Sequence, residues 1–132
     1  MATWQTDFHF EIGASGLPDD YRERFGTVLP VGRSWSSEIE LWGSLDSDRI
    51  EVVRELGGAP EVYCRFDLRE WKPDLYGRFI ECVHAIGGRL RTPEGDAVAV
   101  EHESFENALR SSTAARFVAN PEEFLRTLRE RT

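Results

Sequence analysis

The sequence predicts an α+β fold: a two-layer sandwich in which helices pack mostly on one face of a mainly antiparallel sheet of four or five strands. The strongest indication is a strand–helix–strand unit over residues 61–91. Several other short segments alternate apolar and polar side chains, and two C-terminal segments carry apolar residues at helical spacing. The length of 132 residues fits a single domain, 1–132.

The predicted strand and helix of the central unit have clear sequence signals, including residues that mark where the helix begins and ends. Residues 61–68 alternate apolar and polar side chains, which predicts a half-buried strand. Residues 73–86 carry apolar residues at helical spacing, which predicts a helix with one buried stripe. Pro73 suits the first position of a helix, and Gly87 suits the left-handed residue at which a helix ends. The predicted stripe consists of Leu75, Phe79, Cys82, Val83 and Ile86.

The N-terminal segment predicts a strand followed by a short helix. Residues 4–12 alternate strictly, so we expect a strand with one apolar and one polar face. The polar face of this strand carries Asp7, His9 and Glu11. A helix is expected to start near Pro18, with Tyr21 and Phe25 turned toward the core.

Two further strands are predicted before the central unit. Residues 37–43 form the first of them. Its inward residues are expected to be Ser37, Ile39 and Leu41, and its outward residues Glu38, Glu40 and Trp42. Residues 49–56 favour a strand because several of their apolar residues are β-branched. A short helix over residues 48–56 is the alternative.

The C-terminal third predicts a turn and two helices. Residues 89–92 and 97–100 flank a turn, so they form either a small hairpin or an interrupted strand. A helix is expected over residues 103–111, with Ser104 as its cap, and another after Asn120, whose side chain would cap it. The residues of the last helix that we expect to pack inward are Phe124, Leu125 and Leu128.

The charge of the chain limits the classes of partner. The formal net charge is −8, from 24 acidic and 16 basic residues. An acidic chain repels phosphate backbones, so no nucleic acid partner is expected, and it would attract a basic protein. Solubility alone is the alternative explanation of this charge. Of the basic residues only Lys72 is not arginine, a bias that is typical of GC-rich bacterial genomes.

No targeting segment is evident in the sequence. No apolar run approaches the length of a membrane span, and the N-terminus lacks the pattern of a secretory signal. We therefore expect a cytoplasmic protein without membrane contact.

No motif for catalysis or for a cofactor is found. The glycine-rich nucleotide signatures are absent, and we expect no cofactor. Cys64 and Cys82 form no C-x-x-C pair and are expected to be buried apolar residues. The row of acids around His9 could bind a metal or hold an acid–base pair, but it is more typical of a solvated face, so we predict no metal site. His84 and His102 are expected to be structural or surface residues.

The predicted outward residues of the first four strands define a candidate binding surface. They are Asp7, His9, Glu11, Glu38, Glu40, Trp42, Glu51, Val53, Tyr63, Arg65, Asp67 and Arg69. Aromatic and arginine side chains are favoured anchors of protein interfaces, and acidic neighbours would select a basic partner. The predicted binding residues are Trp42, Tyr63, Glu38, Glu40, Arg65, Asp7 and His9. The alternatives are that Trp42 only covers an edge of the sheet, or that C-terminal segments bury this face.

These observations favour a non-catalytic, acidic protein-binding domain that neutralises or regulates a basic partner, as an immunity protein does for a toxin. A second hypothesis is a small-molecule-binding or enzymatic domain with a pocket between sheet and helices, using His9, His84 or Arg65. A third is a homodimer formed through the sheet edge, with Trp42 or Trp35 at the contact.

Overall fold

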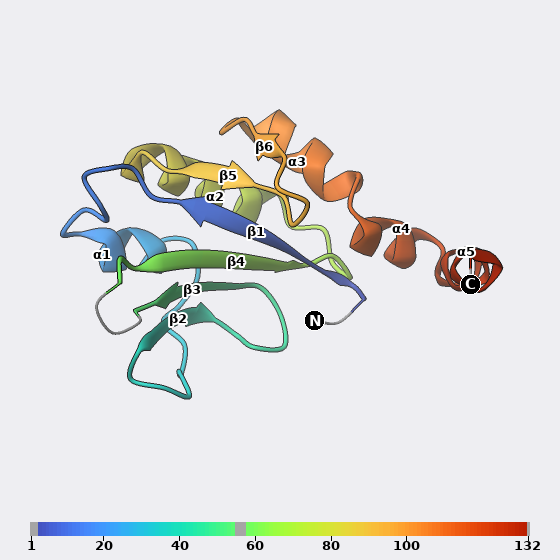
Figure 1. Ribbon diagram of the computed structural model, residues 1–132, viewed down its shortest axis with the longest axis horizontal. Helices are drawn as coiled ribbons and strands as arrows, with labels where there is room; N and C mark the ends of the chain where they lie inside the picture. The colour runs from blue at the N-terminus through green and yellow to red at the C-terminus, as the bar shows by residue number, and fades with distance from the viewer. Residues whose placement is uncertain (1–2, 55–57, 132) are drawn as a thin grey trace.

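The computed structural model describes residues 3–54 and 58–131, and it confirms the α+β class (Figure 1). The strands are β1 (Gln5–Glu11), β2 (Ile39–Gly43), β3 (Arg49–Val53), β4 (Glu61–Asp67), β5 (Arg89–Arg91) and β6 (Ala97–Val98). The helices are α1 (Tyr21–Gly26), α2 (Pro73–Ile86), α3 (His102–Arg110), α4 (Thr113–Ala119) and α5 (Pro121–Arg131).

The six strands form one sheet in the order β2-β3-β4-β1-β5-β6, and every neighbouring pair is antiparallel. The prediction of an antiparallel sheet is therefore confirmed. β3 ends at Val53, so the strand alternative holds over that stretch, while residues 55 and 56 of the predicted strand lie outside the described residues. The hydrogen-bonded neighbours of β1 are β4 and β5, and both lie far along the chain from it.

The strand count of four or five is wrong, because residues 89–98 form a hairpin that extends the sheet. Leu90 pairs with Val98, and the backbone N–H of Thr92 donates to the carbonyl of Asp96 at 2.9 Å. Gly95 supplies the left-handed residue of the turn, with φ of 93°. Strands this short carry no readable alternation, so sequence left the choice between hairpin and interrupted strand open.

Antiparallel register gives the sheet two different faces. Phe8 lies opposite Cys64, Cys64 opposite Ile50, and Ile50 opposite Trp42, and this row belongs to what we call the apolar face. The next row belongs to what we call the polar face. It runs His9, Tyr63, Glu51 and Leu41. Because directly opposite residues share a face, the register fixes which side chains of distant strands meet.

Residues of four helices, α1 to α4, join the apolar face in one hydrophobic cluster. The ring centroid of Phe66 on β4 lies 4.9 Å from that of Phe79 on α2 and 5.3 Å from that of Phe105 on α3. α1 joins the cluster through Phe25, whose ring lies 5.1 Å from that of Trp42 on β2. Edge-to-face aromatic pairs of this kind add specific geometry to the burial of apolar surface.

The predicted orientation of the β2 strand is wrong. Trp42 is only 3% exposed and packs against Phe25 and Tyr21 of α1, so it faces the core. Ile39 and Leu41 lie on the polar face instead. The local pattern is ambiguous, because apolar residues at 39, 41 and 42 fit either phase of alternation. The aromatic residues of α1 decide between the two phases.

Helix α2 follows the sequence prediction closely. It begins with Pro73 and ends at Ile86, followed by Gly87 with φ of 80°. The N–H groups of Gly87 and Gly88 close the last turn by donating to carbonyls of residues 83 and 84. The predicted stripe is buried apart from the half-buried Ile86, and the structure adds Tyr76 and Ile80 to it.

The helices after the hairpin differ from the prediction. α3 begins at His102, and Glu101 occupies the cap position, so Ser104 lies inside the helix and is not its cap. α4 was not predicted, because the segment is only 7 residues long. Its one clear signal is Ser112, whose hydroxyl accepts a hydrogen bond from the N–H of Ala115 at 3.1 Å.

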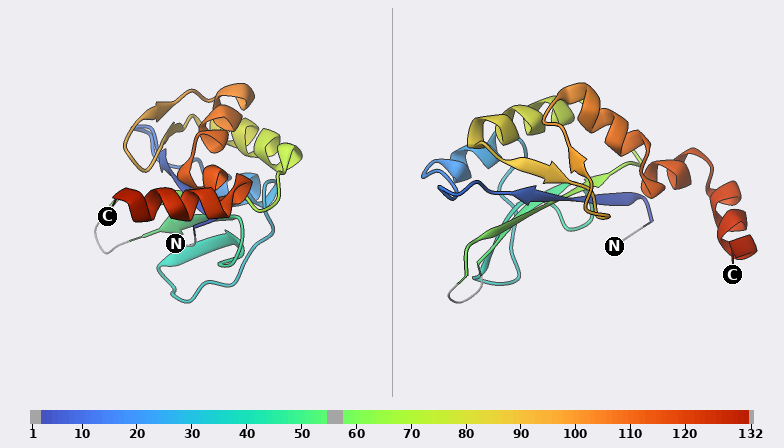
Figure 2. Two further views of the ribbon diagram at one scale, coloured as in Figure 1. Left: turned by 90° about the vertical axis from the view of Figure 1, so that its right-hand side faces the viewer. Right: turned by 45° about the horizontal axis from the view of Figure 1, so that its top comes forward.

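Helix α5 is capped as predicted, but its residue Leu125 does not pack inward as expected. The Asn120 side chain accepts from the N–H of Glu123 at 3.1 Å. Figures 1 and 2 show α5 beyond the end of the sheet, and Leu125 is 41% exposed, so its predicted burial is wrong. The side chains of Phe124 and Leu128 lie outside the described residues. None of the described helices has the length and apolar character that crossing a membrane requires.

Candidate binding face

The polar face brings four of the seven predicted binding residues together. Asp7 lies directly opposite Arg65, and His9 lies directly opposite Tyr63, across the β1–β4 pair. This arrangement follows from the alternation of the two strands, which was read correctly, and from their register, which sequence did not specify.

Asp7 and Arg65 form a two-point ion pair. The Nε of Arg65 donates to Oδ1 of Asp7 at 2.6 Å, and Nη2 donates to Oδ2 at 3.1 Å. The hydrogen bond to Asp7 raises the pKa of the Arg65 guanidinium. An exposed pair contributes only about 0–1 kcal/mol to stability, so the main effect here is to hold both side chains in one geometry.

Tyr63 is the exposed aromatic residue of this face. It is 41% exposed, and its ring stacks on that of His9 with centroids 5.5 Å apart and planes inclined by 22°. Its hydroxyl donates to Oε2 of Glu61 at 2.5 Å. A tyrosine held on both its ring and its hydroxyl loses little conformational entropy when a partner covers it.

Arg49 and Glu51 of β3 continue the face beyond Tyr63. The Nε of Arg49 lies 2.7 Å from Oε1 of Glu51, and Glu51 is only 8% exposed. Burial lowers the pKa of Arg49, because desolvation disfavours the charged form. Together with Asp7, Tyr63 and Arg65 they line a small hollow of about 140 Å³.

Among the described residues, the hollow on the polar face is lined by no reactive thiol. Its remaining lining residue is Cys64, which is 1% exposed, and burial raises the pKa of this thiol well above its usual value. A thiol that stays protonated is a poor nucleophile and a poor metal ligand. The expectation that Cys64 is a buried apolar residue is confirmed.

Sequence reasoning missed the arginines that pair with the acids of this face. Arg91 of β5 forms an ion pair with Glu11 of β1, and Arg49 pairs with Glu51. Arg49 stands two residues before Glu51 in a strand, so the same alternation could have placed it on this face. Arg91 could not be placed, since its position depends on the hairpin.

Glu40 and Trp42, which we expected on the binding surface, lie on the other face. Glu40 accepts hydrogen bonds from the hydroxyl of Tyr21 and from Arg22 and Arg54. Burial alone would raise the pKa of Glu40, but hydrogen bonds from these neighbours outweigh it and lower the pKa. Glu40 therefore anchors α1 to the sheet.

Glu38 is exposed and precedes β2. Its backbone carbonyl accepts from the N–H of Arg54 at 2.8 Å. It therefore stands apart from the four residues that come together on β1 and β4.

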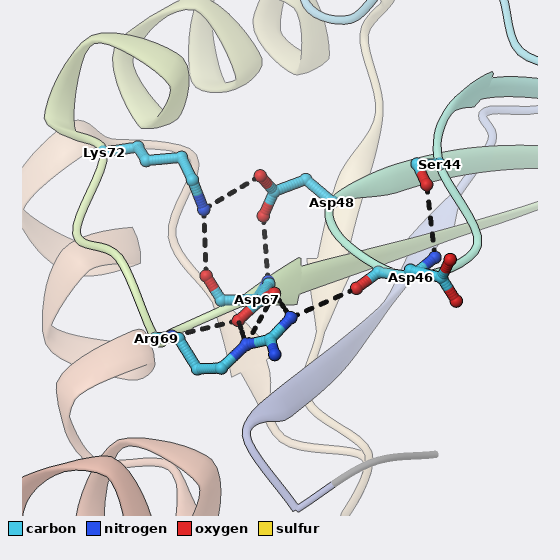
Figure 3. Close-up of polar contacts among 6 residues, drawn as sticks. All are labelled: Ser44, Asp46, Asp48, Asp67, Arg69 and Lys72. Atoms are coloured by element: carbon cyan, nitrogen blue, oxygen red, sulfur yellow. Dashed lines mark hydrogen bonds and ion pairs between the residues drawn. The ribbon is translucent and has the colours of Figure 1, made fainter.

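Asp67 and Arg69, also expected on that surface, belong to a separate ionic cluster at the end of β4 (Figure 3). The N–H of Asp67 donates to Oδ1 of Asp48 at 2.8 Å, and Nζ of Lys72 lies 3.0 Å from Oδ2 of the same carboxylate. Arg69 pairs with the Asp67 side chain at 2.6 Å. Asp48 and Asp67 are 5% and 4% exposed, so the cluster joins the β2–β3 turn to the start of α2.

The three histidines do not converge on one site. His9 stacks on Tyr63, His84 is exposed on α2, and Nε2 of His102 lies 2.7 Å from Oε1 of Glu106 on the same helix. Among residues 3–54 and 58–131, no group of three or more histidine, cysteine, aspartate or glutamate side chains is placed to hold a metal ion.

Searches of protein-family models, curated proteins and solved structures found no match to this chain. The function is therefore inferred from the geometry of the molecule.

Proposed function

We propose that this chain is a non-catalytic protein-binding domain whose helices pack mostly on the apolar face and whose polar face contacts the partner. The observation that carries the proposal is Tyr63, which is 41% exposed and stacked on His9. Around it lie the ion pairs of Asp7 with Arg65 and of Glu51 with Arg49.

The proposal is supported by the fixed positions that these side chains hold in the isolated chain. Immobilising a flexible side chain at an interface costs about 0.5–1.5 kcal/mol of binding free energy. Here Arg65 is held at two points by Asp7, and Tyr63 is held at its ring and its hydroxyl. Tyrosine and arginine are also enriched among the residues that carry most of the binding energy of interfaces.

The charge of the chain favours a basic partner, as for an immunity protein that neutralises a toxin. The net charge of −8 would accelerate encounter with such a protein in the bacterial cytoplasm. The acids of the polar face are mostly paired with arginines. They would therefore contribute mainly to the specificity of the contact, and the other acids of the chain would supply most of the long-range attraction. Association should therefore slow at high salt, while dissociation changes little.

The proposal is tested by affinity capture with a matched pair of aromatic variants. The purified chain is incubated with lysate of its source organism at low and high salt, and bound proteins are identified by mass spectrometry. Tyr63→Ala should weaken capture of the partner at least about tenfold, equivalent to about 1.4 kcal/mol. Trp71→Ala is the control, because Trp71 is similarly exposed at 38% but lies off the polar face. Equal loss in both variants would contradict the proposal.

A homodimer remains a second candidate, now restricted to Trp35. Trp42 is buried, whereas Val31 and Trp35 are 78% and 58% exposed. Val31 bridges to Trp42 at the outer edge of β2, so both exposed residues belong to the segment at that edge. Sedimentation velocity should then show a dimer that Trp35→Ala converts to a monomer. A monomer at all concentrations would exclude this candidate.

A further inference from the structure

A second concave site lies away from the polar face. A cavity of about 340 Å³ is enclosed by the start of β1, the β5–β6 turn at residues 92–96, and the α3–α4 connection at residues 111–114. Figures 1 and 2 show the β5–β6 turn and α4 close to the start of β1. The cavity falls at the small end of the range that ligand sites occupy, about 300–1,000 Å³.

The inner wall combines apolar surface with one buried hydroxyl. Phe8, Ala108 and Ala114 supply the apolar part. Thr6 also lines the cavity and is only 6% exposed, and among the described residues its hydroxyl is not one of the buried polar atoms that lack a partner. A hydroxyl at the wall of a cavity can exchange a hydrogen bond with water, and a polar group of a ligand would take the place of that water.

The mouth of the cavity is negatively charged. Glu94 and Asp96 of the β5–β6 turn line it, and no lysine, arginine or histidine does so among residues 3–54 and 58–131. The turn is fixed, because the N–H of Asp96 donates to the hydroxyl of Thr92 at 3.1 Å. The nearby guanidinium of Arg91 is engaged by Glu11 and by the carbonyl of Gly95. An anionic ligand would therefore be repelled, and a cation attracted.

We propose that this cavity binds a small organic cation, in which a primary ammonium group is joined by a short apolar chain to a hydroxyl. The ammonium group lies at Glu94 and Asp96, and the chain lies against Phe8 and the two alanines. The hydroxyl end exchanges a hydrogen bond with Thr6. This site is independent of the polar face, and its occupant is a small molecule.

Three probes of matched size separate the contributions: 5-aminopentanol, n-hexylamine, which lacks the hydroxyl, and 6-hydroxyhexanoate, which reverses the charge. Binding is followed by amide chemical shifts of the full chain in two-dimensional NMR. We expect 5-aminopentanol to bind with a dissociation constant of about 1 mM. Its shifts should cluster at residues 5–8, 92–96 and 108–114. The anion should cause none of them.

Variants then test each contact. Thr6→Val removes the hydroxyl and keeps the shape, so it should weaken 5-aminopentanol at least about threefold and leave n-hexylamine unchanged. Asp96→Asn should weaken both amines about threefold to tenfold. Glu81→Gln, on the groove between α1 and α2, is the charge control and should change neither.

Several outcomes would overturn the proposal. Amine shifts spread over the whole acidic surface would show unspecific ion attraction, as would equal weakening by Glu81→Gln and Asp96→Asn. Equal binding of 6-hydroxyhexanoate would exclude the cation assignment. If Thr6→Val fails to fold, Ala108→Leu, which fills the cavity from a half-buried position, must abolish the clustered shifts.

Discussion

Replacing Trp42 with alanine tests the register that separates the two faces of the sheet. Trp42 is 3% exposed, and its ring lies 5.1 Å from that of Phe25 and 6.3 Å from that of Tyr21. Removing a buried aromatic side chain costs about 3–5 kcal/mol, from lost burial and from the cavity left behind. A domain of this size has about 5–15 kcal/mol of stability, so about a fifth or more of it would be lost.

The assay is urea unfolding followed by far-ultraviolet circular dichroism. With a slope of about 2 kcal/mol per molar urea, the midpoint for Trp42→Ala should fall by about 2 M. Trp35→Ala is the matched control, because Trp35 is 58% exposed and its loss should cost about 0.5 kcal/mol or less. Trp42→Ala within about 1 kcal/mol of wild type, or equal losses in both variants, would refute the register and return Trp42 to the binding surface.

Three further predictions concern α2 and its surroundings. Gly87→Ala should destabilise the protein by about 1–2 kcal/mol, because Gly87, directly after α2, has φ of 80°. Gly77→Ala, inside α2, should instead stabilise the protein by about 0.5–1 kcal/mol. Lys72→Met should cost about 3 kcal/mol in urea unfolding, because it leaves the Asp48 carboxylate, with a side chain 6% exposed, without its ion pair. Burial raises the pKa of Tyr76 to about 12, so the stability that this phenol contributes is present below about pH 10 and lost as the pH rises toward 12. Unfolding curves from pH 8 to 12 should show a smaller loss of stability in Tyr76→Phe than in wild type, because the buried Cys64 thiol, whose pKa is also raised, contributes the same loss to both.

Each of these predictions has a clear contrary result. Equal effects of the two glycine variants would mean that the helix does not end at Gly87. A Lys72→Met variant as stable as wild type would mean that Asp48 is solvated. The same alkaline loss in wild type and Tyr76→Phe would assign that loss to other groups.

The parts of the fold that were predictable from sequence have local signals. Pro73 and Gly87 mark the ends of α2, and the alternation of β1 and β4 placed Asp7, His9, Tyr63 and Arg65 on one face. The sequence did not specify how β1 and β4 pair with each other. Asp7 and Arg65 are 58 residues apart, and only the register of two strands brings them together.

The failures have non-local causes. The phase of β2 was decided by Phe25 and Tyr21, which belong to another element. β5, β6 and α4 are too short for their periodicity to be read, although Ser112 was a usable cap signal. The predicted inward packing of the last helix assumed a core within its reach, whereas α5 lies beyond the end of the sheet and leaves Leu125 exposed (Figure 2).

Photo-cross-linking in the source organism tests the central claim most directly. A photoreactive phenylalanine analogue replaces Tyr63, and parallel strains carry it at Trp35 or Trp71, which are also exposed. If the polar face is the binding surface, position 63 should give one dominant adduct with a different protein, and position 71 should give none. A cross-link at 71 or 35 without one at 63, or an adduct at 63 with a second copy of this chain, would contradict the account.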